Sequence, residues 1–218
     1  MKLKILLGCA ALCFALAAQA APTILVLGDS LSAGYGLNAG EGWVSLLQQK
    51  LKSQGLPQTV VNASLSGDTT AGGLSRLPPA LRAHKPDLVL IELGANDGLR
   101  GQSVVQMQAN LAQLITMSRA AGARPLLLEM RIPSNYGAAY TQGFTRAFAT
   151  VAAQGQAVLV PFFLAPIAGD EHNFQDDGIH PNAGAQARML EAVWPSLRPL
   201  LSRPVSGSSP RNKNERRS

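Results

Sequence analysis

The feature that most constrains the fold is a regular alternation of short aliphatic runs with segments of helical spacing. The aliphatic runs are nearly continuous in apolar residues, which is typical of parallel strands covered on both faces. They lie at Thr23–Leu27, Thr59–Asn62, Asp87–Leu93, Pro125–Met130 and Ala157–Val160. The helical segments lie at Trp43–Leu51, Leu74–Arg82, Val104–Ala120, Tyr140–Val151 and Asn182–Trp194. This order predicts an α/β fold, a three-layer α/β/α sandwich with a five-stranded parallel sheet. Pro195 is expected to end the last helix.

The first twenty residues are predicted to be a secretory signal peptide, residues 1–20. Lys2 and Lys4 give a positive start, an apolar run follows, and Ala18-Gln19-Ala20 forms a small-x-small cleavage site. The apolar run is shorter than the roughly 20 residues of a membrane span, and no later segment comes close to that length. We therefore expect a chain that is exported to the periplasm or secreted, without stable membrane insertion. A hydrophobic N-terminal anchor is the alternative interpretation.

The formal charge of +6 lies in the two ends of the chain. The predicted signal peptide carries +2, and the Ser-, Pro-, Asn- and Arg-rich stretch 202–218 carries a net +4, which leaves residues 21–201 uncharged overall. A basic stretch of this composition buries no core and is predicted to be a disordered tail. The charge distribution therefore argues against nucleic acid as a partner, and one domain is expected over residues 21–201.

Both cysteines, Cys9 and Cys13, lie inside the predicted signal peptide. The mature chain is therefore expected to form no disulfide and to offer no thiolate to a metal or a substrate.

In an open parallel sheet, functional groups gather in the loops at the carboxyl ends of the strands. Ser30 follows the first predicted strand directly, in a Gly-led turn that projects its hydroxyl above the sheet. His180 precedes Pro181 and is held extended by it. Asp177 is placed three residues earlier, across the flexible Gly178, so that its carboxylate accepts the Nδ1 hydrogen of His180. The spacing predicts a nucleophile, a general base and an orienting carboxylate.

Two further loops offer donors for the oxyanion of an acyl-transfer reaction. Gly67 follows the second strand and brings a backbone N–H close to a ligand without a side chain between them. Asn96 follows the third strand, and its amide donates without titrating. With the backbone N–H of Ser30, these groups form the expected oxyanion hole.

Other interpretations of these residues remain open. A Gly-Asp-Ser turn is also typical of a helix cap, and the segment before His180 also fits a capped helix start. A divalent metal site built from His172, Asp176, Asp177 and His180 is a further alternative, although no other feature of the sequence requires an ion.

Four short motifs, in this order, resemble the SGNH (GDSL) hydrolase family. They contain Ser30 in Gly-Asp-Ser-Leu, Gly67 in the second block, Asn96 in Gly-Ala-Asn-Asp and His180 in Asp-Gly-Ile-His. The stretches 92–101, 132–137 and 175–182 resemble most closely the bacterial periplasmic branch of thioesterases, lysophospholipases and arylesterases. Ala95 departs from the pattern, because relatives often carry glycine there, and its methyl group narrows the cleft.

The resemblance implies a flavodoxin-like SGNH hydrolase fold and a serine hydrolase that acts on small-molecule acyl esters and thioesters through an acyl-enzyme. It implies no metal and no organic cofactor. Leu31, Ala95, Leu99 and Ile132 are expected to border the acyl chain. A carbohydrate O-acetylesterase of the same family and a non-catalytic exported binding protein are the competing functions. The sequence leaves the oligomeric state and the physiological substrate open.

Overall fold

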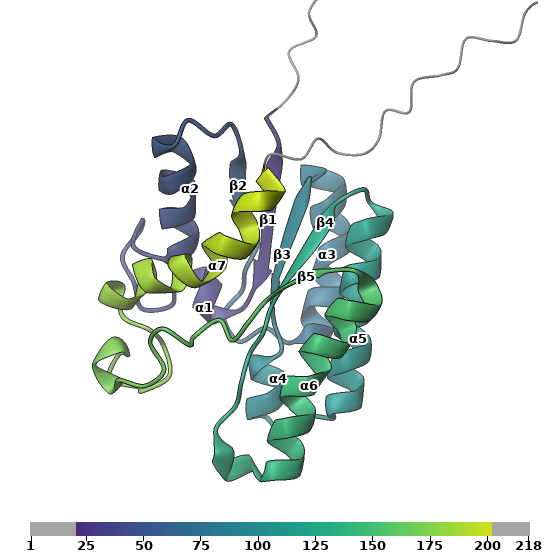
Figure 1. The fold of residues 1–218 in the computed structure, drawn as a ribbon, viewed down its shortest axis with the longest axis vertical. Helices are drawn as coiled ribbons and strands as arrows, with labels where there is room; N and C mark the ends of the chain where they lie inside the picture. Colours follow the sequence, from purple (N-terminus) through teal and green to yellow (C-terminus); the bar gives the residue numbers. More distant parts are fainter. Residues whose placement is uncertain (1–20, 202–218) are drawn as a thin grey trace, which may run out of the picture.

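The computed structural model describes residues 21–201, and within them five parallel strands form a single sheet (Figure 1). The strands are β1 (Thr23–Gly28), β2 (Thr59–Asn62), β3 (Leu88–Glu92), β4 (Arg124–Leu128) and β5 (Val158–Val160). Their order across the sheet is β2-β1-β3-β4-β5, so β2 lies on one side of β1 and the three later strands lie on its other side. The predicted five-stranded parallel sheet is confirmed, with every strand within a few residues of its expected position.

The helices cover both faces of the sheet, as the three-layer prediction requires. One face carries α2 (Trp43–Ser53) and α7 (Gln186–Leu201), and the other carries α3 (Thr70–His84), α5 (Val104–Ala120) and α6 (Ala138–Gly155) (Figure 1). Two short helices, α1 (Ser30–Ala33) and α4 (Ala95–Leu99), directly follow β1 and β3. Single 3-10 turns lie at Ser134–Tyr136, Glu171–Asn173 and Ala183–Ala185.

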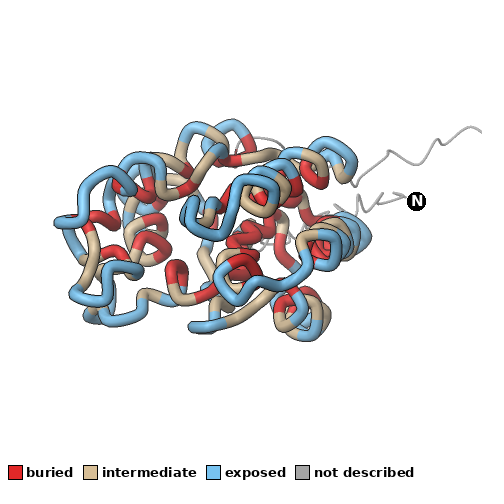
Figure 2. The backbone as a smooth tube through the Cα atoms, turned by 90° about the horizontal axis from the view of Figure 1, so that it is seen from below, coloured by how far each residue is buried: buried red, intermediate tan, exposed pale blue. Residues whose placement is uncertain are grey.

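The core lies between the two layers of helices, and Figure 2 shows its buried residues inside a shell of exposed turns. All five residues of β3 are buried, as are Ile24 to Leu27 of β1. These central strands are apolar on both faces because each face packs against helices. Helix α2 buries Trp43, Leu47 and Leu51, whose spacing places them on one stripe of the helix.

The prediction that the last helix ends at Pro195 is wrong. Helix α7 continues to Leu201, with Pro195 and Pro199 inside it. Each proline removes one backbone hydrogen bond and costs about 3 kcal/mol in a helix interior. Residues on both sides of Pro195 compensate this loss by packing into the core, namely Met189, Leu190, Val193, Leu197, Leu200 and Leu201. Tertiary burial therefore outweighs the local preference.

The predicted signal peptide 1–20 and the predicted tail 202–218 lie outside the described residues. Among residues 21–201, no helix has the length and apolar character that crossing a membrane requires.

Gly94 links β3 to α4 and generates a stability prediction. Its φ of 116° is unfavourable for an L side chain, and an added Cβ would stand 3.0 Å from Phe148 Cζ and 3.3 Å from Met107 Sδ. Gly94→Ala is therefore expected to lower the free energy of unfolding by about 3 kcal/mol, from backbone strain and overpacking together. Denaturant unfolding measures this loss.

Gly122→Ala is the matched control, because Gly122 also has a positive φ, of 85°, but a Cβ there meets no atom within 4 Å. It is expected to cost only the strain, about 1 kcal/mol. Equal losses in the two variants would contradict the packing contribution at Gly94.

Candidate active site

Ser30 stands at the carboxyl edge of the sheet because β1 ends two residues before it. Asp29 caps α1, and its Oδ1 accepts a hydrogen bond from the backbone N–H of Leu31 at 3.0 Å. Gly28 leaves no room for a side chain, since a Cβ there would stand 2.7 Å from both Glu92 and Ser32. The sharp turn from strand to helix therefore directs the half-buried Ser30 outward.

His180 connects Ser30 to Asp177 in one series of hydrogen bonds. The Nε2 atom of His180 lies 2.9 Å from Ser30 Oγ, and its Nδ1 atom lies 2.6 Å from Asp177 Oδ2. The other carboxylate oxygen of Asp177 accepts the backbone N–H groups of His180 and Ile179, each at 2.9 Å. The backbone N–H of His180, its side chain and the N–H of Ile179 lower the pKa of Asp177 to about 2. Asp177 is therefore ionised at neutral pH, and its carboxylate accepts the Nδ1 hydrogen of His180.

The loop that carries His180 is tied to the turn after α1 through Gln175. Its Nε2 atom donates to Tyr35 O at 2.8 Å, and its backbone N–H donates to His180 O at 2.8 Å. Gly36 makes this contact possible, because a Cβ there would stand 2.0 Å from Gln175 Oε1. The ring of Tyr35 then lies against the imidazole of His180, with 4.4 Å between ring centroids.

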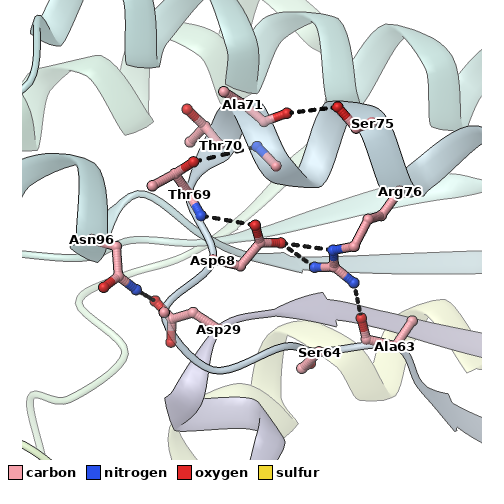
Figure 3. A network of polar contacts seen from close by, with 12 residues as sticks. Asp29, Ala63, Ser64, Asp68, Thr69, Thr70, Ala71, Ser75, Arg76 and Asn96 are labelled. Carbon is pink, nitrogen blue, oxygen red and sulfur yellow. Dashed lines mark hydrogen bonds and ion pairs between the residues drawn. The ribbon is translucent and has the colours of Figure 1, made fainter.

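The three groups predicted to hold an oxyanion are free to donate. Asn96 Nδ2 gives one hydrogen to Asp29 Oδ2 at 3.0 Å, which leaves its second amide hydrogen available (Figure 3). Within residues 21–201, the backbone N–H groups of Ser30 and Gly67 donate to no acceptor. Gly67 has a φ of 78°, which favours glycine.

The segment that carries Gly67 is fixed by Arg76 on α3 (Figure 3). The guanidinium of Arg76 pairs with the carboxylate of Asp68, with Nε at 2.9 Å, and also donates to Ala63 O. Thr69 caps α3 by accepting the N–H of Gly72. Arg100 on the next loop donates to Gly67 O at 2.8 Å.

A buried pair of carboxyl groups, Asp29 and Glu92, lies beneath the turn. Asp29 is 1% exposed and Glu92 is fully buried. Glu92 Oε2 accepts the hydroxyl of Ser32 at 2.7 Å and the N–H of Asp29 at 3.3 Å. Burial raises the pKa of Asp29 to about 6, and burial together with the charge of Asp29 raises the pKa of Glu92 well above its ordinary value. Near pH 7 we therefore assign the negative charge to Asp29 and the proton to Glu92.

The four residues expected to border an acyl chain differ in position. Leu31 is 7% exposed and belongs to the core, so its side chain packs the turn down and does not offer a surface to an acyl chain. Leu99 is 38% exposed, and Ala95 and Ile132 are half-buried.

Several large apolar side chains are exposed in the segments that follow the strands. The exposed large apolar side chains of the described part are Tyr35, Leu65, Leu99, Val105, Tyr136 and Ile179. Each strand of the sheet is followed by at least one of them, so they come from the same segments of the chain as Ser30, Asn96 and His180. Exposed apolar side chains in such segments are available to contact an apolar group.

The alternative metal site is not assembled in the described residues. His172 pairs with Asp170 at 2.9 Å instead of turning toward Asp177, and its side chain is exposed. Within residues 21–201, no group of three or more His, Cys, Asp or Glu side chains is arranged to hold an ion.

Sequence reasoning did not assign roles to Tyr35, Gln175 or Glu92. For the Gly-Asp-Ser turn it offered a helix cap as one interpretation, and Asp29 provides that cap for α1. Glu92 carried a signal, since it is an ionisable residue in a run of buried aliphatic residues, where charges are rare unless they have partners. The contacts of Tyr35 and Gln175 join segments about 140 residues apart, and no local pattern in the sequence indicates such contacts.

A hydroxyl, an imidazole and a carboxylate in series, above a parallel sheet, define the class of serine hydrolases. Comparison with known families agrees with this class: residues 26–188 match the GDSL-like lipase/acylhydrolase family. The chain belongs to this family, and it is a hydrolase of the class that acts on ester bonds.

Individual relatives of this chain support its assignment to the family. The chain is 52% identical to "Esterase TesA" of Pseudomonas aeruginosa over 201 residues, covering 92% of this chain and all of that protein. It is 44% identical to "Thioesterase 1/protease 1/lysophospholipase L1" of Escherichia coli, covering 85% of this chain and 88% of that protein. A solved esterase, EstA from Pseudoalteromonas, inhibited by monoethylphosphonate, superposes with a TM-score of 0.79 at 45% identity over 83% of this chain and 99% of its own.

The buried pair generates a prediction about pH and stability. Because the pKa of Glu92 lies well above 4.5 in the folded state, the folded protein retains a proton that the unfolded chain releases. The free energy of unfolding therefore falls as the pH rises above this value. Glu92→Gln has no such proton to lose. Relative to the unchanged protein, the variant is expected to gain stability as the pH rises from about 5 upward, by at most about 1.4 kcal/mol per pH unit.

Thermal or urea unfolding across that pH range measures the difference. Glu41→Gln is the control, because Glu41 is exposed and hydrogen bonds from Asn38 lower its pKa. The control is expected to show no gain with rising pH. A constant difference between Glu92→Gln and the unchanged protein would contradict a protonated Glu92.

Proposed function

We propose that the chain hydrolyses carboxylic esters and acyl thioesters through an acyl-enzyme on Ser30, with His180 as general base and Asp177 as the orienting carboxylate. The observation that carries the proposal is the hydrogen-bond series from Ser30 Oγ to His180 Nε2 at 2.9 Å and from His180 Nδ1 to Asp177 at 2.6 Å. A serine hydroxyl is a weak nucleophile until a neighbouring base takes its proton.

The proposed reaction has two steps. His180 Nε2 takes the Ser30 proton as Oγ bonds to the acyl carbon, and the carbonyl electrons move onto oxygen. When the tetrahedral intermediate collapses, the bond to the alcohol or thiol breaks and His180 returns the proton to that leaving group. Water then attacks the acyl-enzyme, His180 takes the proton of this water, and the acid leaves as Ser30 recovers its hydrogen.

The oxyanion of both intermediates is assigned to the N–H groups of Ser30 and Gly67 and to Asn96 Nδ2. Each such donor contributes about 3 kcal/mol to transition-state stabilisation in acyl-transfer enzymes. The bond from Asn96 to Asp29 supports this role, because it fixes the amide before the substrate arrives. An ionised Asp29 accepts hydrogen bonds only, so it also fixes which end of the amide donates.

The substrate class follows from the surroundings of Ser30. The exposed apolar side chains in the segments that follow the strands support acyl groups longer than acetyl as substrates. The names of the relatives, which include esterase, thioesterase and lysophospholipase, agree with ester and thioester substrates. We therefore favour small-molecule acyl esters and thioesters over acetylated carbohydrates, and no cofactor is required by these steps.

The location and the domain boundaries are proposed from the sequence. A signal peptide over residues 1–20 implies export to the periplasm or the medium, with one hydrolase domain over residues 21–201 and a basic tail over residues 202–218. Nucleic acid and stable membrane insertion are not part of the proposal, for the reasons of charge and length given above.

Ser30→Ala is the direct test of the proposed nucleophile. Hydrolysis of p-nitrophenyl butyrate is expected to fall by about 10³-fold or more, because the acyl-enzyme no longer forms. A fluorophosphonate probe is expected to label the peptide that contains Ser30, as read by mass spectrometry. Ser64→Ala is the control, since the Ser64 hydroxyl is buried on the neighbouring loop without a hydrogen-bond partner in the described structure. Unchanged hydrolysis in Ser30→Ala would exclude the assigned nucleophile.

A series of p-nitrophenyl esters from acetyl to palmitoyl, run beside a panel of acyl-CoA thioesters, tests the substrate class. We expect activity to extend to the longer acyl groups and to the thioesters. Activity confined to acetyl esters would favour the carbohydrate O-acetylesterase instead.

A further inference from the structure

A cavity of about 450 Å³ lies beside the proposed active site, between the loop after β4 and the first half of α6. Its polar lining includes Arg131 and Ser134 from the loop and Gln142 and Arg146 from the helix, together with the apolar Ile132. We call it the arginine pocket. Nothing in the proposed mechanism uses these polar side chains.

Ile132 joins the arginine pocket to the active site. Its Cγ2 atom lies 2.7 Å from the position that a Cβ on Gly98 would occupy, so the two residues pack directly together. Gly98 follows Asn96 by two residues within α4. When the carbonyl of a substrate lies at Asn96, another part of the same substrate can therefore reach the arginine pocket.

The two arginines are arranged to receive an anion. Arg131 donates through Nε to Glu129 at 3.0 Å and stacks over the ring of Phe162 at 4.8 Å, which holds its guanidinium in place. Glu129 takes only the Nε hydrogen, and the terminal nitrogens of Arg131 have no acceptor among the described residues. Arg146 is exposed and forms no ion pair within that part of the chain. Two guanidinium groups against one carboxylate leave a positive excess at the pocket.

The charge on the other side of the active site has the opposite sign. A second cavity, of about 780 Å³, is lined by Tyr35, Phe174, Asp176 and Asp177, which lie next to His180. Its carboxylates repel an anionic group. An anionic substrate therefore gains most when its charge lies toward α6.

We propose that the arginine pocket binds the phosphate groups of the alcohol or thiol part of the substrate. The inference rests on the proposed function and extends it to the leaving group. Guanidinium groups bind phosphate oxygens through paired hydrogen bonds, and Ser134 and Gln142 add neutral donors. Two substrates present this chemistry, namely acyl-CoA thioesters and lysophospholipids.

Arg146→Gln tests the proposal, because Arg131 cannot be removed without leaving the mostly buried Glu129 unpaired. The KM for a medium-chain acyl-CoA is expected to rise about tenfold at low salt, as for the loss of one charge-assisted hydrogen bond, with kcat within about twofold. The thioester of the same acid with N-acetylcysteamine, which has no phosphate, is expected to show no change. High salt is expected to reduce the difference between the two substrates.

Lysophosphatidylcholine and the monoacylglycerol of the same acyl chain form the second arm and distinguish the two sources of phosphate. A rise in KM for acyl-CoA alone assigns the pocket to CoA phosphates, and a rise for lysophosphatidylcholine alone assigns it to the phosphodiester. Equal effects on the phosphate-bearing and phosphate-free substrates, or no effect on any of them, would overturn the proposal.

Arg82→Gln is the matched control, because it removes the same charge from the last turn of α3, at the opposite edge of the sheet. It is expected to leave every KM unchanged. Arg146→Lys retains the charge without the paired geometry and is expected to restore part of the affinity. An equal rise in KM in Arg82→Gln would indicate a general charge effect and would overturn the proposal that the arginine pocket binds phosphate.

Binding of CoA to the Ser30→Ala protein, measured by calorimetry, separates this proposal from the proposed function. If the unchanged protein hydrolyses no ester, the proposed function fails. Weaker binding of CoA when Arg146→Gln is added to Ser30→Ala still supports the pocket, and unchanged binding contradicts it.

Discussion

The pairing of β1 with β3 is the constraint on which the rest of the structure depends. The register sets Gly28 opposite Glu92, and the residues that follow these two strands carry Ser30 and Asn96. Because both strands are packed on both faces, a shift of one residue would send the side chains of the shifted strand to the wrong faces of the sheet and displace its loop relative to the other loop. The hydrogen bond from Asn96 to Asp29 then links the two loops directly. The relative position of the proposed nucleophile and the proposed amide donor is thus fixed by strand pairing, before any side chain of the site is considered.

The same pairing forces two carboxyl groups into the interior. Asp29 must lie close to Glu92, since Gly28 and Glu92 are partners in the sheet. Burying both as anions would cost far more than one hydrogen-bonded charge, so a proton remains on the pair. The charge left on Asp29 faces the amide of Asn96 and the backbone of Leu31. This arrangement lowers stability at neutral pH and orients the amide of Asn96 beside the proposed nucleophile, a compromise often found at functional sites.

The sequence predicted the fold well because the five strands are short, nearly continuous aliphatic runs, and the segments between them have helical spacing. It also predicted the approach of His180 to Asp177, since the two lie three positions apart and Gly178 adopts the positive φ that lets the chain turn. Contacts between segments that are distant in the sequence, such as that of Gln175 with Tyr35, could not be predicted. The expected stop at Pro195 failed because local preference was outweighed by core packing. Leu31 was expected to border the acyl chain but is buried in the core, because a loop position alone does not indicate which way a side chain points.

The charges around Ser30 divide the site into two halves, and this division bears on how a substrate is oriented. Arg100, Arg131 and Arg146 come from the segments that follow β3 and β4, whereas Asp176 and Asp177 come from the segment that follows β5. The acyl carbon must lie between them, within reach of Ser30 and the three N–H donors. A leaving group that carries phosphate is attracted to the α6 side and repelled from the His180 side, so it approaches in one orientation. A neutral aryl ester experiences no such preference. Discrimination between these substrates therefore depends on groups outside the triad, and it belongs to binding, not to the chemical step.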